Sequence, residues 1–157
     1  EISDEFLQML DSVCRKDARI VAAFMGKYQN YEESIKKYPL LAANSRCLGA
    51  QEDALAVTEC MDLYVNPKRN GGGSSVAEAL YKGLPAVTLP VGDVSAAAGE
   101  SFRVADYGEM AETILHFASD EDYYERMSRL AEERAEQLMD SKNSFCGVID
   151  ELEQDMN

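Results

Sequence analysis

Three consecutive glycines, Gly71–Gly73, join a short apolar run to a helical segment, and this junction constrains the fold more than any other feature. Asp62–Val65 predicts a strand, Val76–Lys82 predicts a helix that ends at Gly83, and Val87–Leu89 predicts the next buried strand. A strand, a turn, a helix and a second strand are the repeating unit of a parallel sheet. The segment therefore predicts an α/β fold with the glycine turn at the carboxyl end of the strands.

The glycine turn has the chemistry of an anion site. The first N–H groups of a helix have no partner within the helix, and the positive end of the helix dipole points the same way. Ser74 and Ser75 stand where the helix begins, so their hydroxyls can cap it or reach a ligand. A tight connection needs glycine only for a positive φ, and three glycines followed by two serines exceed that need. We therefore predict a phosphate site at the glycine turn.

Glu78 is the second informative residue. It lies four residues after Ser74 and three after Ser75, which places it on the same side of the helix. A carboxylate there can accept two hydrogen bonds from a ribose while the turn holds the phosphates. The helix dipole alone also favours a glutamate in the first turns, so an exposed structural Glu78 is the alternative.

The rest of the chain alternates strands with helices. Further helices are expected at residues 4–16, 31–38 (ended by Pro39), 52–60, 106–118, 120–139 and 145–152, and further strands at residues 18–24, 46–48 and 102–105. Ser3 is the expected N-cap of the first helix, and two helices carry an apolar stripe: Phe6, Leu7, Leu10, Val13 and Cys14 in 4–16, and Tyr123, Met127, Leu130, Ala131 and Leu138 in 120–139. The continuous apolar run Ala18–Phe24 is typical of a strand that is buried on both faces. Residues 92–100 are small and are expected to form a loop at the sheet edge. The pattern predicts a single domain, residues 1–157, with a Rossmann-like parallel sheet flanked by helices.

Composition and charge narrow the classes of function. The chain has 157 residues, 46% of them hydrophobic, which suits one domain with a sizeable core. The net charge is −14, and residues 100–157 carry 16 acidic against 5 basic residues. This excess disfavours duplex nucleic acid and anionic membranes as partners. No apolar run approaches the roughly 20 residues of a membrane span, and no signal peptide is evident, so we expect a cytoplasmic protein.

Cysteine and histidine usage gives no sign of a metal site. Cys14, Cys47, Cys60 and Cys146 form no CxxC pair and have no histidine at ligand spacing. We expect them to be buried free thiols in a reducing compartment. The single histidine, His116, falls in a predicted helix, where we expect a structural or surface role.

Motifs of several nucleotide-binding and hydrolytic classes are missing from the sequence. There is no GxxxxGK[ST] loop of the ATP-hydrolysing type and no GxGxxG fingerprint for a dinucleotide. There is also no Gly-x-Ser-x-Gly elbow of the hydrolase type. The predicted phosphate site therefore differs from the better-known phosphate loops.

Residues 48–93 resemble the nucleotide-sugar half of GT-B glycosyltransferases. The glycine spacing, Glu78–Ala79, Gly83 and Pro85 match the retaining branch, whose C-terminal domain carries a stretch like E-G-F-G-x-x-x-x-E-A-x-x-x-G-x-P-V. Asn70 stands in place of the first Glu of that pair. The Asn-Gly-Gly-Gly-Ser-Ser form is more similar to O-GlcNAc-transferase-like enzymes and related bacterial protein glycosyltransferases.

The resemblance implies a role for each matching residue. It implies that the glycine turn binds the diphosphate of a nucleotide sugar, that Glu78 binds the ribose hydroxyls, and that Leu48–Asp53 lies near the base. It also implies a basic side chain near the diphosphate, for which Lys27 is the candidate. The expected nucleotide-sugar-binding residues are Asn70, Gly71, Gly72, Gly73, Ser74, Ser75, Glu78 and Lys27. No catalytic residue is identified.

The resemblance, which extends over roughly residues 2–150, implies the donor-binding domain of a glycosyltransferase that uses a UDP-sugar without a metal or other cofactor. The chain does not begin with Met, and we expect an acceptor-binding N-terminal domain outside it. Alone, the domain is expected to bind nucleotide and to be inactive. Two alternatives stay open. Asn70 in place of an acid motivates a non-catalytic subunit that stabilises a partner enzyme. A nucleotide-sugar epimerase shares the fold, but usually needs more histidines than His116.

Overall fold

The computed structural model describes residues 2–140, and two parallel strand pairs form its centre. The strands are β1 (Ala22–Met25), β2 (Ser45–Gly49), β3 (Tyr64–Val65) and β4 (Ala86–Val87). β1 pairs with β2, β3 pairs with β4, and a single parallel bridge between Thr88 and Arg103 extends the second pair. Parallel strands joined by helical connections confirm the expected α/β class.

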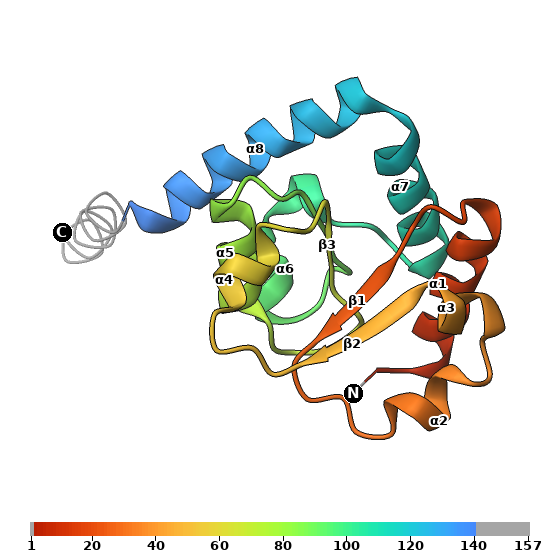
Figure 1. Cartoon of the computed structure of the whole chain (residues 1–157). Helices are drawn as coiled ribbons and strands as arrows, with labels where there is room; N and C mark the ends of the chain where they lie inside the picture. Colours follow the sequence, from red (N-terminus) through yellow and green to blue (C-terminus); the bar gives the residue numbers. More distant parts are fainter. Residues whose placement is uncertain (1, 141–157) are drawn as a thin grey trace, which may run out of the picture.

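Helices occupy the connections and surround both strand pairs. They are α1 (Asp4–Lys16), α2 (Tyr31–Ile35), α3 (Pro39–Ala43), α4 (Ala54–Thr58), α5 (Gly73–Tyr81), α6 (Gly92–Ala98), the 3-10 helix η1 (Glu100–Phe102), α7 (Tyr107–Ser119) and α8 (Glu121–Met139). α1 and α7 pack together on one side of the strands, and α4, α5 and α6 gather on the other (Figure 1). α8 packs along α5, so α5 has helical neighbours on several sides.

The first helix forms where its capping residue and apolar spacing predict it. Ser3 is the N-cap of α1, and its hydroxyl accepts a hydrogen bond from the backbone N–H of Phe6 at 3.2 Å. Acidic residues occupy the first turn and basic residues the last, which suits the helix dipole. One face of the helix is buried, which confirms the predicted apolar stripe.

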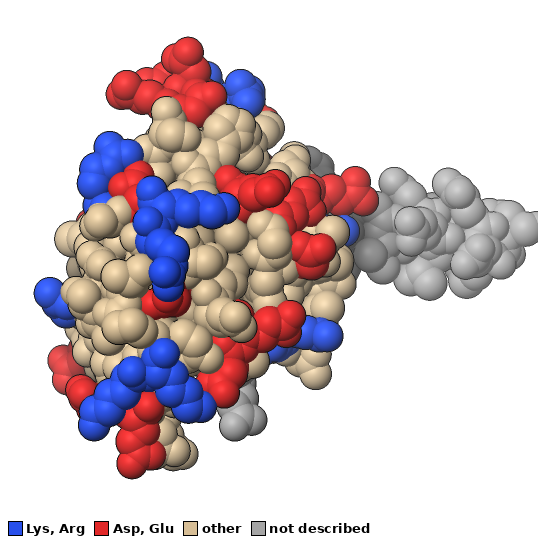
Figure 2. Space-filling model, turned by 90° about the vertical axis from the view of Figure 1, so that its right-hand side faces the viewer, with Lys and Arg blue, Asp and Glu red and all other residues tan. Residues whose placement is uncertain are grey.

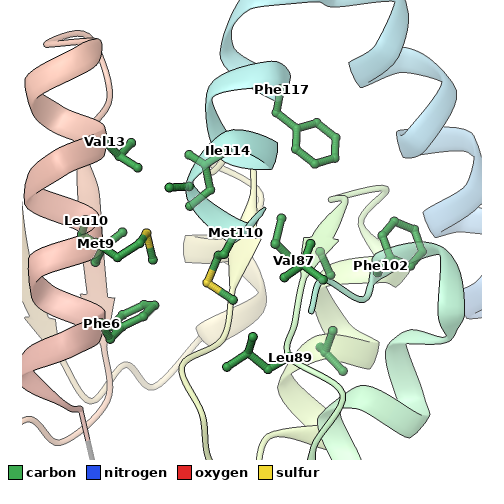
Figure 3. Packing of buried hydrophobic residues seen from close by; sticks show 14 of the residues in the cluster. Phe6, Met9, Leu10, Val13, Val87, Leu89, Phe102, Met110, Ile114 and Phe117 are labelled. Carbon is green, nitrogen blue, oxygen red and sulfur yellow. The ribbon is translucent and has the colours of Figure 1, made fainter. Parts of the chain in front are cut away.

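α1, α7 and β4 supply the centre of the hydrophobic core. Figure 3 shows Phe6 and Leu10 of α1 facing Met110 and Ile114 of α7, with Val87 of β4 beside them. All these side chains are buried. The core thus fixes β4, and with it the strand pair that carries the glycine turn.

Two predictions about helices were wrong. Residues 92–100 do not form a loop, because Gly92–Ala98 is α6, which packs against α5 with Val94, Ser95 and Ala98 buried. Small side chains give a weak hydrophobic pattern, but they allow two helices to approach closely. The helix expected at residues 31–38 forms but ends at Ile35, and Pro39 begins α3, a position at which proline's missing N–H costs nothing.

Two predictions about strands were also wrong. Residues 102–105 form no strand, since η1 ends at Phe102 and only Arg103 forms a bridge. The run Ala18–Phe24 is not buried on both faces, because β1 begins at Ala22, and Val21 before it and Met25 at its end are 60% and 42% exposed. Burial alternates along β1: Phe24 is buried, whereas Ala23 and Met25 are exposed, so one face of the strand is left uncovered by the described residues.

Two of the cysteines and one core leucine lie elsewhere than expected. Cys14 is a buried free thiol, and burial raises its pKa. Cys47 and Cys60 are free but exposed, so the prediction that they are buried was wrong. Leu138 was expected in the core stripe of α8, and it is 39% exposed because it lies at the end of the helix. Cys146 and the predicted helix 145–152 lie outside the described residues.

Charges of both signs cover the outer face of the α1 side. Figure 2 shows Lys and Arg side chains interleaved with Asp and Glu on this face, and Lys37–Asp4 and Arg15–Asp11 form ion pairs at 3.0 and 3.4 Å. This face therefore lacks the continuous basic surface that nucleic-acid binding requires. A search of residues 2–140 finds no helix that is both long and apolar enough to span a membrane.

Candidate functional site

The amino terminus of α5 is open. The helix begins at Gly73 after the N-cap Gly72, whose φ is 115°, and no side chain caps it. The first N–H to bond back to the turn is that of Val76, which donates to the Gly72 carbonyl at 3.0 Å. Within residues 2–140, no group accepts a hydrogen bond from the backbone N–H of Gly73, Ser74 or Ser75. These donors and the helix dipole give the turn the chemistry that an anion site requires.

The two serines of the turn have different surroundings. The Ser75 hydroxyl donates to the Gly72 carbonyl at 3.0 Å and lies 3.0 Å from the Tyr64 hydroxyl, which ties the turn to β3. Ser74 is exposed, and its hydroxyl bonds to none of the residues that the structure describes. Neither serine caps the helix. Ser74 is thus available to a ligand, whereas Ser75 holds the turn in place.

A buried asparagine holds an arginine against the same turn. Asn66 follows β3 and is 2% exposed, and its Oδ1 accepts a hydrogen bond from Arg69 Nε at 2.9 Å. The Tyr64 hydroxyl lies 3.3 Å from the same oxygen, and Asn66 Nδ2 donates to the Pro67 carbonyl at 2.8 Å. A Cβ on Gly72 would lie 2.8 Å from Arg69 Nη2. The guanidinium therefore lies directly against the glycine turn.

α6 brings an acidic side chain to this turn. Gly92, with φ 74°, approaches so closely that a Cβ on it would lie 2.6 Å from the Asn70 carbonyl oxygen. The backbone N–H of Asp93 donates to that oxygen at 3.1 Å. A Cβ on Gly73 would lie 3.2 Å from Asp93 Oδ2. A bound anion would therefore meet a negative side chain as well as the positive one.

Glu78 faces a shallow, mainly apolar groove. The groove has a volume of about 200 Å³ and is lined by Leu55, Ala77, Glu78, Tyr81, Ala135, Leu138 and Met139. Glu78 is half-buried, and no hydrogen bond or ion pair of its carboxylate is found within residues 2–140. α4, which supplies Leu55, packs on α5 and directly follows Leu48–Asp53. The stretch expected near the base and the residue expected at the ribose therefore belong to neighbouring elements.

A family model described as "Glycosyl transferases group 1" matches residues 3–120. The chain belongs to this family. The search of curated proteins finds no match for this chain, but many solved structures resemble it.

Three solved structures show the fold of this chain. Anabaena Alr3699/HepE in complex with UDP matches with a TM-score of 0.70 and 17% identity, over 94% of this chain and 44% of that one. Thermobaculum terrenum O-GlcNAc transferase matches with a TM-score of 0.77 and 16% identity, over 97% and 33%. Staphylococcus aureus TarM in complex with UDP matches with a TM-score of 0.71 and 19% identity, over 83% and 28%. The expected GT-B glycosyltransferase fold is confirmed, and the chain spans less than half of each of these proteins.

Lys27, the basic residue expected near the diphosphate, follows a strand of the other pair in the domain. It is exposed, it follows β1, and it forms no hydrogen bond or ion pair with the residues described. The basic residue in contact with the turn is Arg69, which the sequence analysis missed. The sequence did offer a signal for Arg69. This residue stands directly before Asn70 and the glycines, and three residues after Asn66, which follows the predicted strand.

The other expected residues form one continuous site. Asn70 and Gly71–Ser75 make the turn, and Glu78 lies on α5 just beyond it. The Asn70 side chain is exposed and bonds to no residue in the described part, whereas its carbonyl anchors α6. The binding roles of all these residues, Lys27 included, stay predictions.

No group of three His, Cys, Asp or Glu side chains in residues 2–140 is placed to hold a metal ion. His116 is exposed, stacks on Tyr123 with ring centroids 3.9 Å apart, and lies 3.2 Å from Asp120. These contacts give it the surface role that we expected.

Proposed function

We propose that this chain is the donor-binding domain of a glycosyltransferase that uses a UDP-sugar. The observation that carries the proposal is the uncapped amino terminus of α5, with free N–H groups at Gly73–Ser75, in a chain of the group 1 family. HepE and TarM, which share its fold, have been solved with UDP, and HepE also with UDP-glucose. A nucleoside diphosphate carries the negative charge for which this turn is built.

The geometry suits a diphosphate leaving group. When the bond between the sugar and the diphosphate breaks, negative charge grows on the diphosphate oxygen. Backbone N–H groups that already point at this oxygen stabilise the charge without reorganising. In this proposal Glu78 accepts hydrogen bonds from the ribose hydroxyls, and neither a bound metal nor another cofactor takes part.

The acceptor is assigned to a part of the enzyme outside these 157 residues. The support is that the chain spans only 28–44% of the three related structures. We therefore expect the 157-residue chain to bind UDP without transferring sugar. The proposal places the enzyme in the cytoplasm, where exposed free thiols such as Cys47 and Cys60 stay reduced.

Calorimetric titration of the chain with UDP, GDP and ADP tests the proposal. We expect UDP to bind most tightly. Glu78→Gln removes a charged acceptor and should weaken UDP binding by about 10-fold. Glu112→Gln, which removes the same charge from an exposed position on α7, should leave it unchanged. Absence of binding for all three nucleotides, or equal effects of the two substitutions, would contradict the proposal.

A further inference from the structure

We infer that Arg69 is the basic residue that binds the donor diphosphate, and that Asn66 is the positioning residue that aims it. This inference rests on the proposed function, because it assigns a residue to the diphosphate of the same donor. It gives Arg69, whose side chain lies against the turn, the role that the resemblance predicted for Lys27.

The burial of Asn66 calls for an explanation. A buried amide costs free energy unless its polar atoms are paired. Here the Asn66 N–H donates to the Val87 carbonyl at 3.1 Å, so the residue is anchored to β4. Its side-chain oxygen accepts from Arg69 Nε at 2.9 Å, and its side-chain nitrogen donates to the Pro67 carbonyl. Asn66 therefore holds the guanidinium of Arg69 in a fixed position relative to the strand pair.

Arg69 has donors to spare at this position. Within residues 2–140, Arg69 donates a hydrogen bond through Nε and forms no ion pair. Its Nη1 and Nη2 groups therefore remain available to a ligand. Nη2 lies against Gly72, next to the free N–H groups of Gly73–Ser75. The planar fork of a guanidinium matches the oxygens of a phosphate, and arginine stays charged throughout the physiological pH range. Side-chain and backbone donors thus converge on one diphosphate.

The glycine at position 72 fits this arrangement. Its φ of 115° already favours glycine, and a Cβ would lie 2.8 Å from Arg69 Nη2 and 3.2 Å from Asn66 Oδ1. Glycine is therefore the residue that lets the guanidinium approach the backbone. Asp93, whose carboxylate lies near Gly73, is the opposing charge that Arg69 offsets at the turn.

Arg69 acts on the leaving group and not on a proton. In the transfer, a bond forms between the anomeric carbon and the acceptor nucleophile, and the bond from this carbon to the UDP oxygen breaks. The electron pair of the broken bond stays on the diphosphate, and the proton of the acceptor leaves to a base or to solvent. Arginine does not deprotonate in proteins, so it stabilises the added negative charge electrostatically.

Titration of the 157-residue chain with UDP and with uridine tests the inference. Arg69→Gln should weaken UDP binding by about 10- to 100-fold and leave uridine binding unchanged, because uridine has no phosphate. The UDP affinity of Arg69→Lys should lie between those of the unaltered chain and Arg69→Gln, since lysine keeps the positive charge but lacks the planar fork of the guanidinium. Lys68→Gln removes a neighbouring exposed charge and should change UDP affinity by less than about 3-fold.

A double-mutant cycle tests the role of Asn66. If Asn66 acts through Arg69, Asn66→Ala should weaken UDP binding in the wild-type background and have little further effect in the Arg69→Gln background. Circular dichroism checks that each variant folds, and Asn66→Leu, which has a similar size and no acceptor for Arg69 Nε, replaces the alanine variant if that one unfolds. Additive effects of the two substitutions would overturn the positioning role.

The outcomes separate this inference from the proposed function. If the unaltered chain binds UDP and Arg69→Gln binds it equally well, Arg69 is not the diphosphate residue and the proposed function stands. Equal losses for UDP and uridine would show that Arg69 only holds the fold together. If the unaltered chain binds no UDP, the proposed function fails, and the inference fails with it.

Discussion

The two parallel strand pairs of this domain have the same architecture and very different surroundings. β3 and β4 are joined by the nine-residue helix α5, and Ala86, Val87 and Leu80 in this unit are buried. β1 and β2 are joined by two five-residue helices, and Val21 and Met25 beside or in β1 are largely exposed. The glycine turn belongs to the second pair, in which β4 is buried and β3 is half-buried.

The difference teaches that burial is set by neighbours and not by the apolar content of a strand. Ala18–Phe24 is among the most apolar stretches of the chain, yet the described residues leave much of it uncovered. α5 packs against α4, α6 and α8, which together enclose its strand pair (Figure 1). A site that must hold several hydrogen-bond donors in fixed relative positions requires a rigid frame.

The largest expected effect is a truncation inside the buried unit. Leu80 of α5 is fully buried, so Leu80→Ala should lower the free energy of unfolding by about 3 kcal/mol. Leu55→Ala on α4, where the side chain is 37% exposed, should cost less than about 1 kcal/mol. Urea unfolding monitored by circular dichroism measures both. Similar losses would show that the two leucines are equally buried in solution.

A matched pair of valines compares the two strand pairs directly. Val87→Ala removes two buried carbons from β4 and should cost about 2 kcal/mol. Val21→Ala beside β1 removes the same atoms from an exposed position and should cost less than about 0.5 kcal/mol. Urea unfolding measures both losses. A large loss of unfolding free energy for Val21→Ala would mean that β1 is covered in solution.

A matched pair of glycines separates strain from ligand binding. Gly26 and Gly72 both have positive φ, at 103° and 115°, so an alanine at either should cost about 1–2 kcal/mol. Only Gly72 has close neighbours, because nothing lies within 4 Å of a Cβ on Gly26. Gly72→Ala should therefore displace Arg69 and weaken UDP binding in calorimetry, whereas Gly26→Ala should not. Equal UDP affinities of the Gly72→Ala and Gly26→Ala variants would contradict a role of Gly72 in positioning Arg69.

The smallest expected effect concerns the cap of α8, the helix that packs along α5. Asp120 accepts a hydrogen bond from the Tyr123 N–H at 2.8 Å, and this bond, followed by the contact with His116, lowers the pKa of its carboxyl. The lowered pKa stabilises the folded state above the ordinary value of about 3.9, and the stabilisation is lost as the pH falls through the folded value. Asparagine also caps helices, so Asp120→Asn isolates the charge. Its stability deficit should be present at pH 7 and vanish in strong acid in thermal melts. A deficit that does not depend on pH would contradict this account.

Elements with strong local signals were predictable from the sequence. The cap at Ser3 and the stripe of α1, the glycine turn before α5, and the long helix α8 all follow from capping chemistry, helical periodicity or backbone freedom within a few residues. These signals act over short distances, so they survive in the folded chain.

The parts that escaped prediction depend on contacts between distant segments. α6 forms from small residues because Gly92 packs on the backbone of Asn70, a contact that no local pattern reveals. Arg69 lies against the turn because it bonds to the buried Asn66, and burial of a polar side chain at a strand end is not visible in composition. The exposure of β1 likewise depends on which elements pack on its outer face.

The most direct test of the central claim is a titration with UDP followed by amide NMR of the ¹⁵N-labelled chain. The account predicts that the resonances of Gly73, Ser74 and Ser75 shift together and saturate, because their free N–H groups bind the diphosphate, while those of Ala22 and Ala23 in β1 stay in place. Saturating shifts elsewhere, with the amides of Gly73–Ser75 unmoved, would contradict the claim that the open end of α5 is the donor site.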